Sequence, residues 1–312
     1  MSELYAASRE LPAVVFVNPH AGGGRARKYL PAIQRIFAAR SLPAEFVWTE
    51  TAESLEVKAR TAIDSGRRLL FALGGDGTLQ ALVNAAHGSE VVIGILPAGG
   101  GNDFAAALRI PKNPAAALAA LLSARPQWSD VISARTADGK RRLYVGGGGL
   151  GLDADAANYS ASYTWLPARL RYIAAALRAL HEFKPLRVKA EFPGSALPAI
   201  EEQALLVGAL NTSTYGAGLR LAPGSRIDDG LLTTSFVRDL SAAQILAVLP
   251  NLIASGSLPG KYVLSASAAR VRLTADRECL FHGDGEILGP APVELEVLPR
   301  AIRVLVPGSL PA

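Results

Sequence analysis

The segment Gly74–Thr78, with the sequence GGDGT, combines a flexible backbone with one carboxylate. It follows the apolar run Leu69–Leu73 and precedes the helix-like segment Leu79–Ala86. A buried strand, a tight glycine turn and a helix start bring backbone N–H groups to a helix N-terminus, where the helix dipole favours an anion. Asp76 fits such an anion site if a cation or a hydroxyl donor accompanies the phosphate. The turn therefore suggests a nucleotide handled together with Mg²⁺.

Two more glycine-rich segments follow apolar runs and open helix-like segments. Asn18–Gly24 is followed by the cations Arg25, Arg27 and Lys28, and Leu96–Phe104 carries three glycines before an Asn-Asp pair. Each segment alone is also compatible with an ordinary turn in which glycine supplies a positive φ. Three such loops after strands of one parallel sheet would line up at its carboxyl edge, where open α/β sheets bind ligands.

Two polar segments lie in the second half of the chain. Asp228–Gly230 is either a simple turn or a place where carbonyls and a carboxylate hold Mg²⁺. His282, Asp284 and Glu286 would point to one face if the chain were extended there. Such a group could bind a metal or act as a general base, and the alternative is a polar hairpin tip.

Two other glycine motifs are set aside. Gly146–Gly151 formally fits G-x-G-x-x-G, but no acidic residue follows about 20 positions later, as a dinucleotide-binding motif requires. Gly256–Lys261 resembles a P-loop, but it is one residue short and has no Ser or Thr after its lysine. Neither supports a function.

The positions of apolar runs predict two domains. Up to about residue 125, continuous apolar strands alternate with helices, which indicates a mostly parallel sheet covered on both faces. After Pro126, alternating strands split by Gly, Pro and Asp turns indicate a β-rich domain, with one helix candidate at Trp165–Leu180. We expect an α/β nucleotide-binding domain at 1–127 and a β-rich domain at 128–301, and leave open that the strand near 302–312 returns to the first. The cleft between the domains is the default ligand site.

The expected elements of the first domain can be given by their residues. The expected early strands are Val14–Val17, Ala44–Thr49, Leu69–Leu73 and Val91–Leu96, and the expected helices are Tyr29–Ala39, Leu55–Ser65 and Ala115–Ser123.

Composition narrows the class of partner and the compartment. The chain has 312 residues, half of them hydrophobic, and a formal net charge of +5, which suits anionic partners. Its basic residues are scattered, so we expect no nucleic-acid partner. Cys279 is the only cysteine, which excludes a disulfide framework and a Cys-based zinc site. With no signal-peptide pattern and no apolar run of roughly 18–20 residues, we expect a cytoplasmic protein.

Taken in order, these motifs resemble the diacylglycerol kinase catalytic-domain family, which includes bacterial soluble lipid kinases and, more distantly, sphingosine and ceramide kinases. The resemblance runs over about residues 12–306. The GGDGT element is shared with NAD kinases and, more loosely, with phosphofructokinases. The series that carries the likeness is Asn18-Pro19 with Gly22, GGDGT at 74–78 with Asn84, Pro97 with Gly99 and Asn102-Asp103-Phe104, Gly149 with Gly151 and Asp153-Ala154, Asp228-Asp229-Gly230, and Asp284-Gly285-Glu286.

The resemblance implies an N-terminal α/β domain like that of NAD kinases and phosphofructokinases, an antiparallel β-sandwich, and Mg²⁺-dependent transfer of phosphate from ATP to the hydroxyl of a diacylglycerol-like lipid. Either Glu286 or Asp284 would be the base that takes the proton from the lipid hydroxyl. Asp76, the third catalytic candidate, would anchor Mg²⁺ or position the phosphate. Asp229, with the carbonyls of Arg226 and Leu231, would hold a structural Mg²⁺. The residues expected to contact ATP are Asn18, Gly22, Gly23, Gly24, Thr49, Gly74, Gly75, Asp76, Gly77, Thr78, Gly99, Gly100, Asn102 and Asp103.

A lipid acceptor would be reached at the inner face of the membrane, so we expect peripheral association. Trp165–Tyr172 has the mixed aromatic, apolar and cationic character of an interfacial segment. The alternative is an ordinary buried helix with an exposed arginine edge, which would have the same composition. A homodimer is left open. Ala21 and Gly100 replace a serine and a threonine that are usual in the family, and each change removes a hydroxyl. The alternatives are an NAD kinase-like enzyme, a sphingoid or ceramide kinase, and a nucleotide-binding protein without catalysis.

Overall fold

The computed structural model describes residues 11–151, 185–216 and 218–308. The chain divides into two compact units. The first unit comprises Met1–Val131, Ile227–Asp229 and Leu298–Ala312, and the second comprises Ile132–Arg226 and Gly230–Val297. The expected helix Trp165–Leu180 and the expected interfacial segment Trp165–Tyr172 lie outside the described residues.

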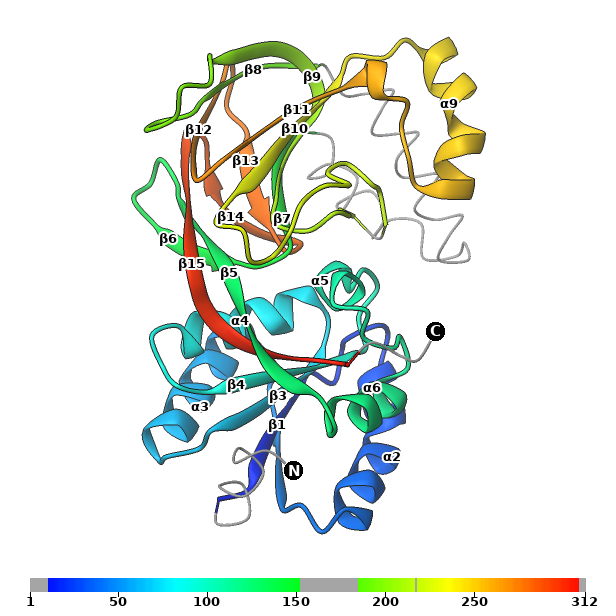
Figure 1. The fold of residues 1–312 in the computed structure, drawn as a ribbon, viewed down its shortest axis with the longest axis vertical. Coiled ribbons are helices and arrows are strands. Elements are labelled where there is room, and N and C mark those ends of the chain that lie inside the picture. Colours follow the sequence, from blue (N-terminus) through cyan, green and yellow to red (C-terminus); the bar gives the residue numbers. More distant parts are fainter. Residues whose placement is uncertain (1–10, 152–184, 217, 309–312) are drawn as a thin grey trace. The chain divides into compact units, whose positions relative to one another are not determined.

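The first unit is built on a parallel sheet with the strand order β15–β4–β3–β1–β2. Helices α3 and α4 cover one face of this sheet, and α2 and α6 cover the other (Figure 1). This arrangement confirms the predicted α/β domain. The elements are β1 (Ala13–Val17), α2 (Arg25–Ala39), β2 (Ala44–Trp48), α3 (Ala52–Asp64), β3 (Leu69–Gly74), α4 (Asp76–Ala86), β4 (Val92–Pro97), α5 (Asp103–Ala107), α6 (Pro114–Leu121), and the parts of β5 (Arg125–Arg135) and β15 (Val293–Val306) that belong to this unit.

The central strands β1, β3 and β4 are buried along their whole length because helices cover both faces. Their continuous apolar sequences are what such a position requires. Helix α3 begins after Thr51, whose side chain accepts a hydrogen bond from the Ser54 N–H at 3.1 Å. Helix α2 begins at Arg25 rather than at the predicted Tyr29, because Gly24, with φ of 90°, turns the chain directly into the helix.

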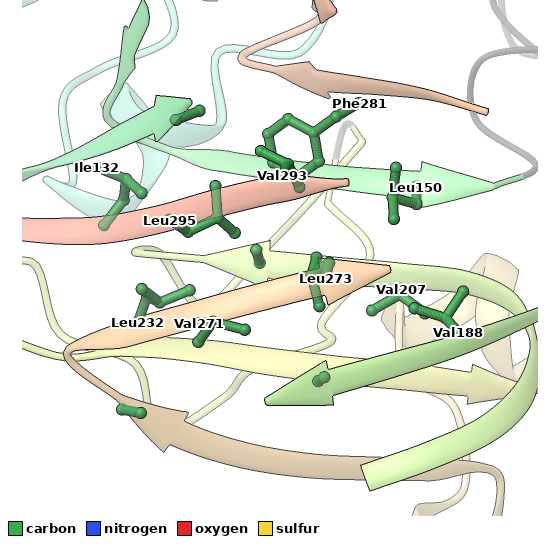
Figure 2. Packing of buried hydrophobic residues seen from close by; sticks show 14 of the residues in the cluster. Ile132, Leu150, Val188, Val207, Leu232, Val271, Leu273, Phe281, Val293 and Leu295 are labelled. Atoms are coloured by element: carbon green, nitrogen blue, oxygen red, sulfur yellow. The ribbon is translucent and has the colours of Figure 1, made fainter. Parts of the chain in front are cut away.

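The second unit is an antiparallel β-sandwich, as predicted. Strand β9 is central, because it pairs with β7, β8 and β10. One large apolar cluster fills the unit, and Leu150, Val207 and Phe281 lie within it (Figure 2). The remaining elements are β6 (Arg141–Tyr144), β7 (Gly147–Gly151), β8 (Leu186–Glu191), β9 (Ile200–Leu210), β10 (Leu232–Arg238), α9 (Ala242–Ser255), the short helix η1 (Gly260–Tyr262), β11 (Val263–Ala268), β12 (Arg270–Ala275), β13 (Leu280–Gly283) and β14 (Glu286–Pro290).

Two long strands, β5 and β15, carry residues of both units. Strand β5 continues through the boundary expected at residues 127–128, and the C-terminal part of β15 pairs with β4 through Arg303 and Val92. Within the first unit, Asp130 of β5 is hydrogen-bonded both to the segment at Ile227 and to Arg300 of β15. Its N–H donates to the Ile227 carbonyl at 2.7 Å, and its Oδ1 accepts from the Arg300 N–H at 2.8 Å.

None of the helices in the described part of the chain is long and apolar enough to cross a membrane.

Candidate active site

Three glycine-rich loops leave the same edge of the first unit's sheet. The first loop (residues 18–24) follows β1, the second (residues 74–78) follows β3, and the third (residues 97–102) follows β4. These strands are parallel neighbours, so their carboxyl ends lie side by side. The predicted alignment of the three loops is therefore confirmed.

The loop backbones approach one another more closely than side chains would permit. A Cβ on Gly22 would overlap the carbonyl oxygen of Ala98, and the φ of 58° at Gly22 also favours glycine. A Cβ on Gly99 would lie 2.5 Å from the Cα of Gly75. The third loop is thus in contact with both of the others.

Polar side chains join the loops further. Asn18 donates from Nδ2 to the hydroxyl oxygen of Thr78 at 3.1 Å, which links the first loop to the second. Arg25 donates from Nε to the Ala98 carbonyl at 3.3 Å and from Nη2 to the Gly99 carbonyl. These bonds hold the loops in a fixed relation at the sheet edge.

Asn102 gives the third loop its shape. It adopts a left-handed conformation, with φ of 58°, and its side chain forms two hydrogen bonds with Gly99. Its Nδ2 donates to the Gly99 carbonyl at 2.8 Å, and its Oδ1 accepts from the Gly99 N–H at 3.1 Å. Asp103 then begins α5. Gly100 is exposed, and no atom lies within 4 Å of the position that its Cβ would occupy.

Asp76 stands in the first turn of α4, at the meeting point of the second and third loops. Its Oδ2 accepts from the Asn102 N–H at 2.6 Å. Burial, and next the negative charge of Asp103, raise the pKa of Asp76 from 3.8 to about 6. Hydrogen bonds from the Asn102 and Phe104 N–H groups act in the opposite direction without cancelling these effects. A divalent cation bound between these two carboxylates would reduce their repulsion. Oxygen donors are the ligands that Mg²⁺ prefers.

Thr49 follows β2 and is buried. Its hydroxyl donates to the Val17 carbonyl at 3.3 Å, and its own N–H donates to the same carbonyl at 3.0 Å. These bonds attach the end of β2 to the end of β1, beside the first loop. Contact between Thr49 and a nucleotide stays a prediction.

The Asp284–Glu286 segment, in the second unit, forms the tip of the β13–β14 hairpin. Asp284 and Gly285 both have positive φ, 52° and 85°, as a two-residue Asp-Gly turn requires. Gly283 therefore pairs with Glu286 across the hairpin. The alternative of a polar hairpin tip is confirmed. The chain reverses at Asp284 and Gly285, so the extended conformation that would bring His282, Asp284 and Glu286 to one face is not formed.

The two carboxylates of this tip differ sharply in environment. Asp284 is buried: its Oδ2 accepts from the Val145 N–H at 2.8 Å, and its Oδ1 accepts from the N–H groups of Gly146 and Gly147 at 2.8 and 3.3 Å. Glu286 is exposed. Asp284 thus fixes the hairpin to the start of β7, and Glu286 is the carboxylate that is accessible from outside.

The expected Mg²⁺ ligands at 226–231 lie on an exposed turn. Asp229 is in the first unit, whereas Arg226 and Leu231 belong to the second. Within residues 11–151, 185–216 and 218–308, no group of three or more His, Cys, Asp or Glu side chains is arranged to hold a metal. The expected set contains only one carboxylate beside two backbone carbonyls, and it stays a prediction.

Two family models match consecutive parts of the chain. The model described as "Diacylglycerol kinase catalytic domain" matches residues 12–134, and "YegS C-terminal NAD kinase beta sandwich-like domain" matches residues 148–306. A Pseudomonas aeruginosa protein named "Probable lipid kinase YegS-like" is 31% identical over 277 residues, covering 88% of this chain and 87% of its own. The chain belongs to the family of diacylglycerol kinases and YegS-like lipid kinases.

Other members of this lipid kinase family match over nearly the full chain. A diacylglycerol kinase of Mycobacterium tuberculosis is 27% identical, with 93% of each chain covered. One from Bacillus subtilis is 25% identical, covering 95% of this chain and 96% of its own. A crystal structure of a diacylglycerol kinase from Bacillus anthracis matches with a TM-score of 0.70 and covers 96% of this chain and 97% of its own. At 19% identity, that last match concerns the fold alone.

The three loops could be located from the sequence, but two supporting contacts could not: that of Arg25 with the third loop, and that of Gly146–Gly151 with the β13–β14 hairpin. The sequence indicates Arg25 only as a cation near phosphate, whereas the structure bonds it to the third loop. The Gly146–Gly151 motif is set aside on sequence grounds, yet its first two N–H groups bind Asp284. An Asp-Gly pair between alternating strands is a hairpin signal, and it agrees with the hairpin-tip alternative that the sequence offered for Asp284.

Proposed function

We propose that this protein transfers the γ-phosphoryl group of ATP to the hydroxyl of a diacylglycerol-like lipid in a Mg²⁺-dependent reaction. The observation that carries the proposal is Asp76, which is bonded to the Asn102 N–H where three glycine loops meet. Phosphoryl transfer needs positioned phosphates, neutralised charge and an oriented nucleophile. Kinase families use ATP as the phosphate donor, and the family models that match this chain are those of lipid kinases.

On the nucleotide side, the loops would bind and orient the phosphates. Gly22, Gly23 and Gly24 all have positive φ and precede the N-terminus of α2, whose backbone N–H groups carry partial positive charge. Mg²⁺ would neutralise negative charge on the β- and γ-phosphate oxygens. Asp76 and Asp103 are the residues that would hold it, because both offer oxygen ligands. Burial of Asp76 and the repulsion from Asp103 disfavour the bare Asp76 carboxylate.

On the acceptor side, Glu286 is the better candidate for the general base. A base must reach the hydroxyl proton of its substrate. The Asp284 carboxylate already accepts from three backbone N–H groups and is buried, whereas Glu286 is exposed at the end of the hairpin. In the reaction, Glu286 would take the hydroxyl proton as the lipid oxygen bonds to the γ-phosphorus. The bond to the bridging oxygen would break and ADP would leave.

A lipid acceptor implies work at a membrane surface, which we propose as peripheral association. Support comes from the class of substrate implied by the family and from the formal net charge of +5, which suits an anionic surface.

The test is transfer of label from γ-labelled ATP to a panel of acceptors: dioleoylglycerol vesicles, ceramide, sphingosine, phosphatidylglycerol and NAD. We expect labelled dioleoylglycerol with Mg²⁺ and none with excess EDTA. Labelling of ceramide or sphingosine would move the enzyme to a sphingoid class, and labelling of NAD would favour an NAD kinase. ATP binding without transfer to any acceptor would select a non-catalytic nucleotide-binding protein and refute the proposal.

A further inference from the structure

Arg25 occupies an unfavourable place for a cation. It is the first residue of α2, and the first turn of that helix contains no acidic residue to offset it. The partial positive charge of a helix N-terminus repels arginine there. The side chain reaches across to the third loop, where it binds two consecutive carbonyls, those of Ala98 and Gly99. A planar guanidinium fork suits two adjacent acceptors in a way that a lysine ammonium does not.

The third loop needs such restraint because it contains three consecutive glycines, Gly99–Gly101. Glycine loses more backbone freedom on ordering than any other residue. The N–H groups of Ala98 and Gly99 are held by the Gly74 carbonyl at 2.7 and 3.2 Å, and the far end of the loop is held where Asn102 bonds to Asp76. Arg25 holds the carbonyl side of the loop's first half.

We propose that Arg25 is a positioning residue that pre-orders the third loop before nucleotide arrives. This inference rests on the proposed function in taking the loop to be part of the ATP site. A pre-ordered loop loses less entropy on binding, so affinity for nucleotide rises without any contact between Arg25 and ATP. The competing role is direct contact between Arg25 and a phosphate.

Arg27 supplies a matched control. It stands in the same first turn and carries the same charge, but its guanidinium lies 5.8 Å from the centre of the Trp48 ring. None of its described contacts reaches the third loop. Replacing either arginine by alanine removes one positive charge beside the first loop, and only Arg25→Ala removes the bonds to Ala98 and Gly99.

A second substitution, Gly100→Ala, should partly restore the loop order that Arg25→Ala removes. The φ of Gly100 is not in the left-handed region, and no atom lies within 4 Å of its would-be Cβ, so alanine fits there without strain. Gly→Ala at a compatible position stabilises by reducing the freedom of the disordered state. In an Arg25→Ala background, Gly100→Ala would restore part of the lost order while adding no group that could bind phosphate.

The experiment is amide hydrogen exchange of residues 98–102 in the full chain without ligand, with Mg²⁺·ATP affinity measured in parallel. We expect about tenfold faster exchange in Arg25→Ala, within twofold of wild type in Arg27→Ala, and recovery of roughly two- to fivefold in Arg25→Ala/Gly100→Ala. Arg25→Lys keeps the charge but can serve only one carbonyl, so its exchange should be intermediate. ATP affinity should follow the same order.

Unchanged exchange in Arg25→Ala with weakened ATP binding would assign Arg25 to direct phosphate contact and overturn the proposal. Failure of Gly100→Ala to recover either exchange or affinity would also overturn it. The exchange measurement needs no turnover. If wild type labelled no lipid while Arg25→Ala still loosened the loop, the proposed function would fail and the restraint by Arg25 would stand.

Discussion

Asp76→Asn is expected to abolish turnover and at the same time make the free protein more stable at neutral pH. Asn keeps an oxygen that can accept the Asn102 N–H, so the link between the second and third loops survives. What disappears is the negative charge, which burial and Asp103 both disfavour. A group retained against such a cost in stability is typical of functional sites.

The size of the effect follows from the pKa of Asp76, which rises from 3.8 to about 6. At 1.36 kcal/mol for each tenfold change, the full rise corresponds to about 3 kcal/mol. The side chain is only partly buried by surface area, so solvent screening reduces this to a range of about 1–3 kcal/mol. The folded-state pKa is the higher one, so folding favours the protonated form of Asp76. The contribution of this protonated form to stability is complete below about pH 4, and it is lost as pH rises through about 6 and the folded protein loses the proton.

The assay is urea unfolding of wild type and Asp76→Asn without metal or nucleotide, at pH 7.5 and pH 4.5. We expect the variant to be more stable by about 1–3 kcal/mol at pH 7.5, and the difference to shrink markedly at pH 4.5. Asp76→Ala is the control: it also removes the charge but leaves the Asn102 N–H without its acceptor, so it should gain less. Equal or lower stability of Asp76→Asn at pH 7.5 would refute the electrostatic reasoning. Near-normal turnover would remove Asp76 from the reacting centre.

Three further predictions concern the loops and the hairpin. Gly22→Ala and Gly23→Ala both place alanine at positive φ, but only the Cβ at position 22 overlaps the Ala98 carbonyl. Gly22→Ala should therefore lower the free energy of unfolding in urea by about 2 kcal/mol more than Gly23→Ala does. Equal losses would refute the contact. Gly100→Thr should tighten Mg²⁺·ATP binding a few-fold and change the free energy of unfolding by less than about 0.5 kcal/mol; unchanged affinity would show that no hydroxyl is missed there. Asp284→Ala should destabilise by about 2 kcal/mol or more, because three backbone N–H groups lose their acceptor; wild-type stability would contradict its anchoring role.

The first unit's sheet was predictable because its strands are buried on both faces. A strand such as Phe71 and its neighbours can contain only apolar residues, and this leaves an unbroken signal in the sequence. The glycine loops were predictable for a related reason: Gly22 and Gly99 must be glycine where backbones come so close. In both cases a local sequence pattern reflects a steric requirement.

What the sequence could not provide depends on distant contacts. Arg25 and Ala98 are 73 positions apart, and no local sequence pattern predicts the hydrogen bond between them. The roles of Asp284 and Glu286 were equally ambiguous, because the two carboxylates differ only through the N–H groups of residues 145–147. Strand β5 continues past Pro126, which the sequence suggested as a break, because Pro can be accommodated near the start of a strand.

The most direct test of the central claim compares Glu286→Gln with wild type in transfer of γ-labelled phosphate to dioleoylglycerol vesicles, with Mg²⁺·ATP affinity measured on the same samples. General-base catalysis contributes about 10²–10⁴-fold. We predict a loss of turnover of at least about a hundredfold, with ATP affinity within about threefold of wild type. Turnover near that of wild type would contradict the assignment of Glu286 as the base in a lipid kinase reaction.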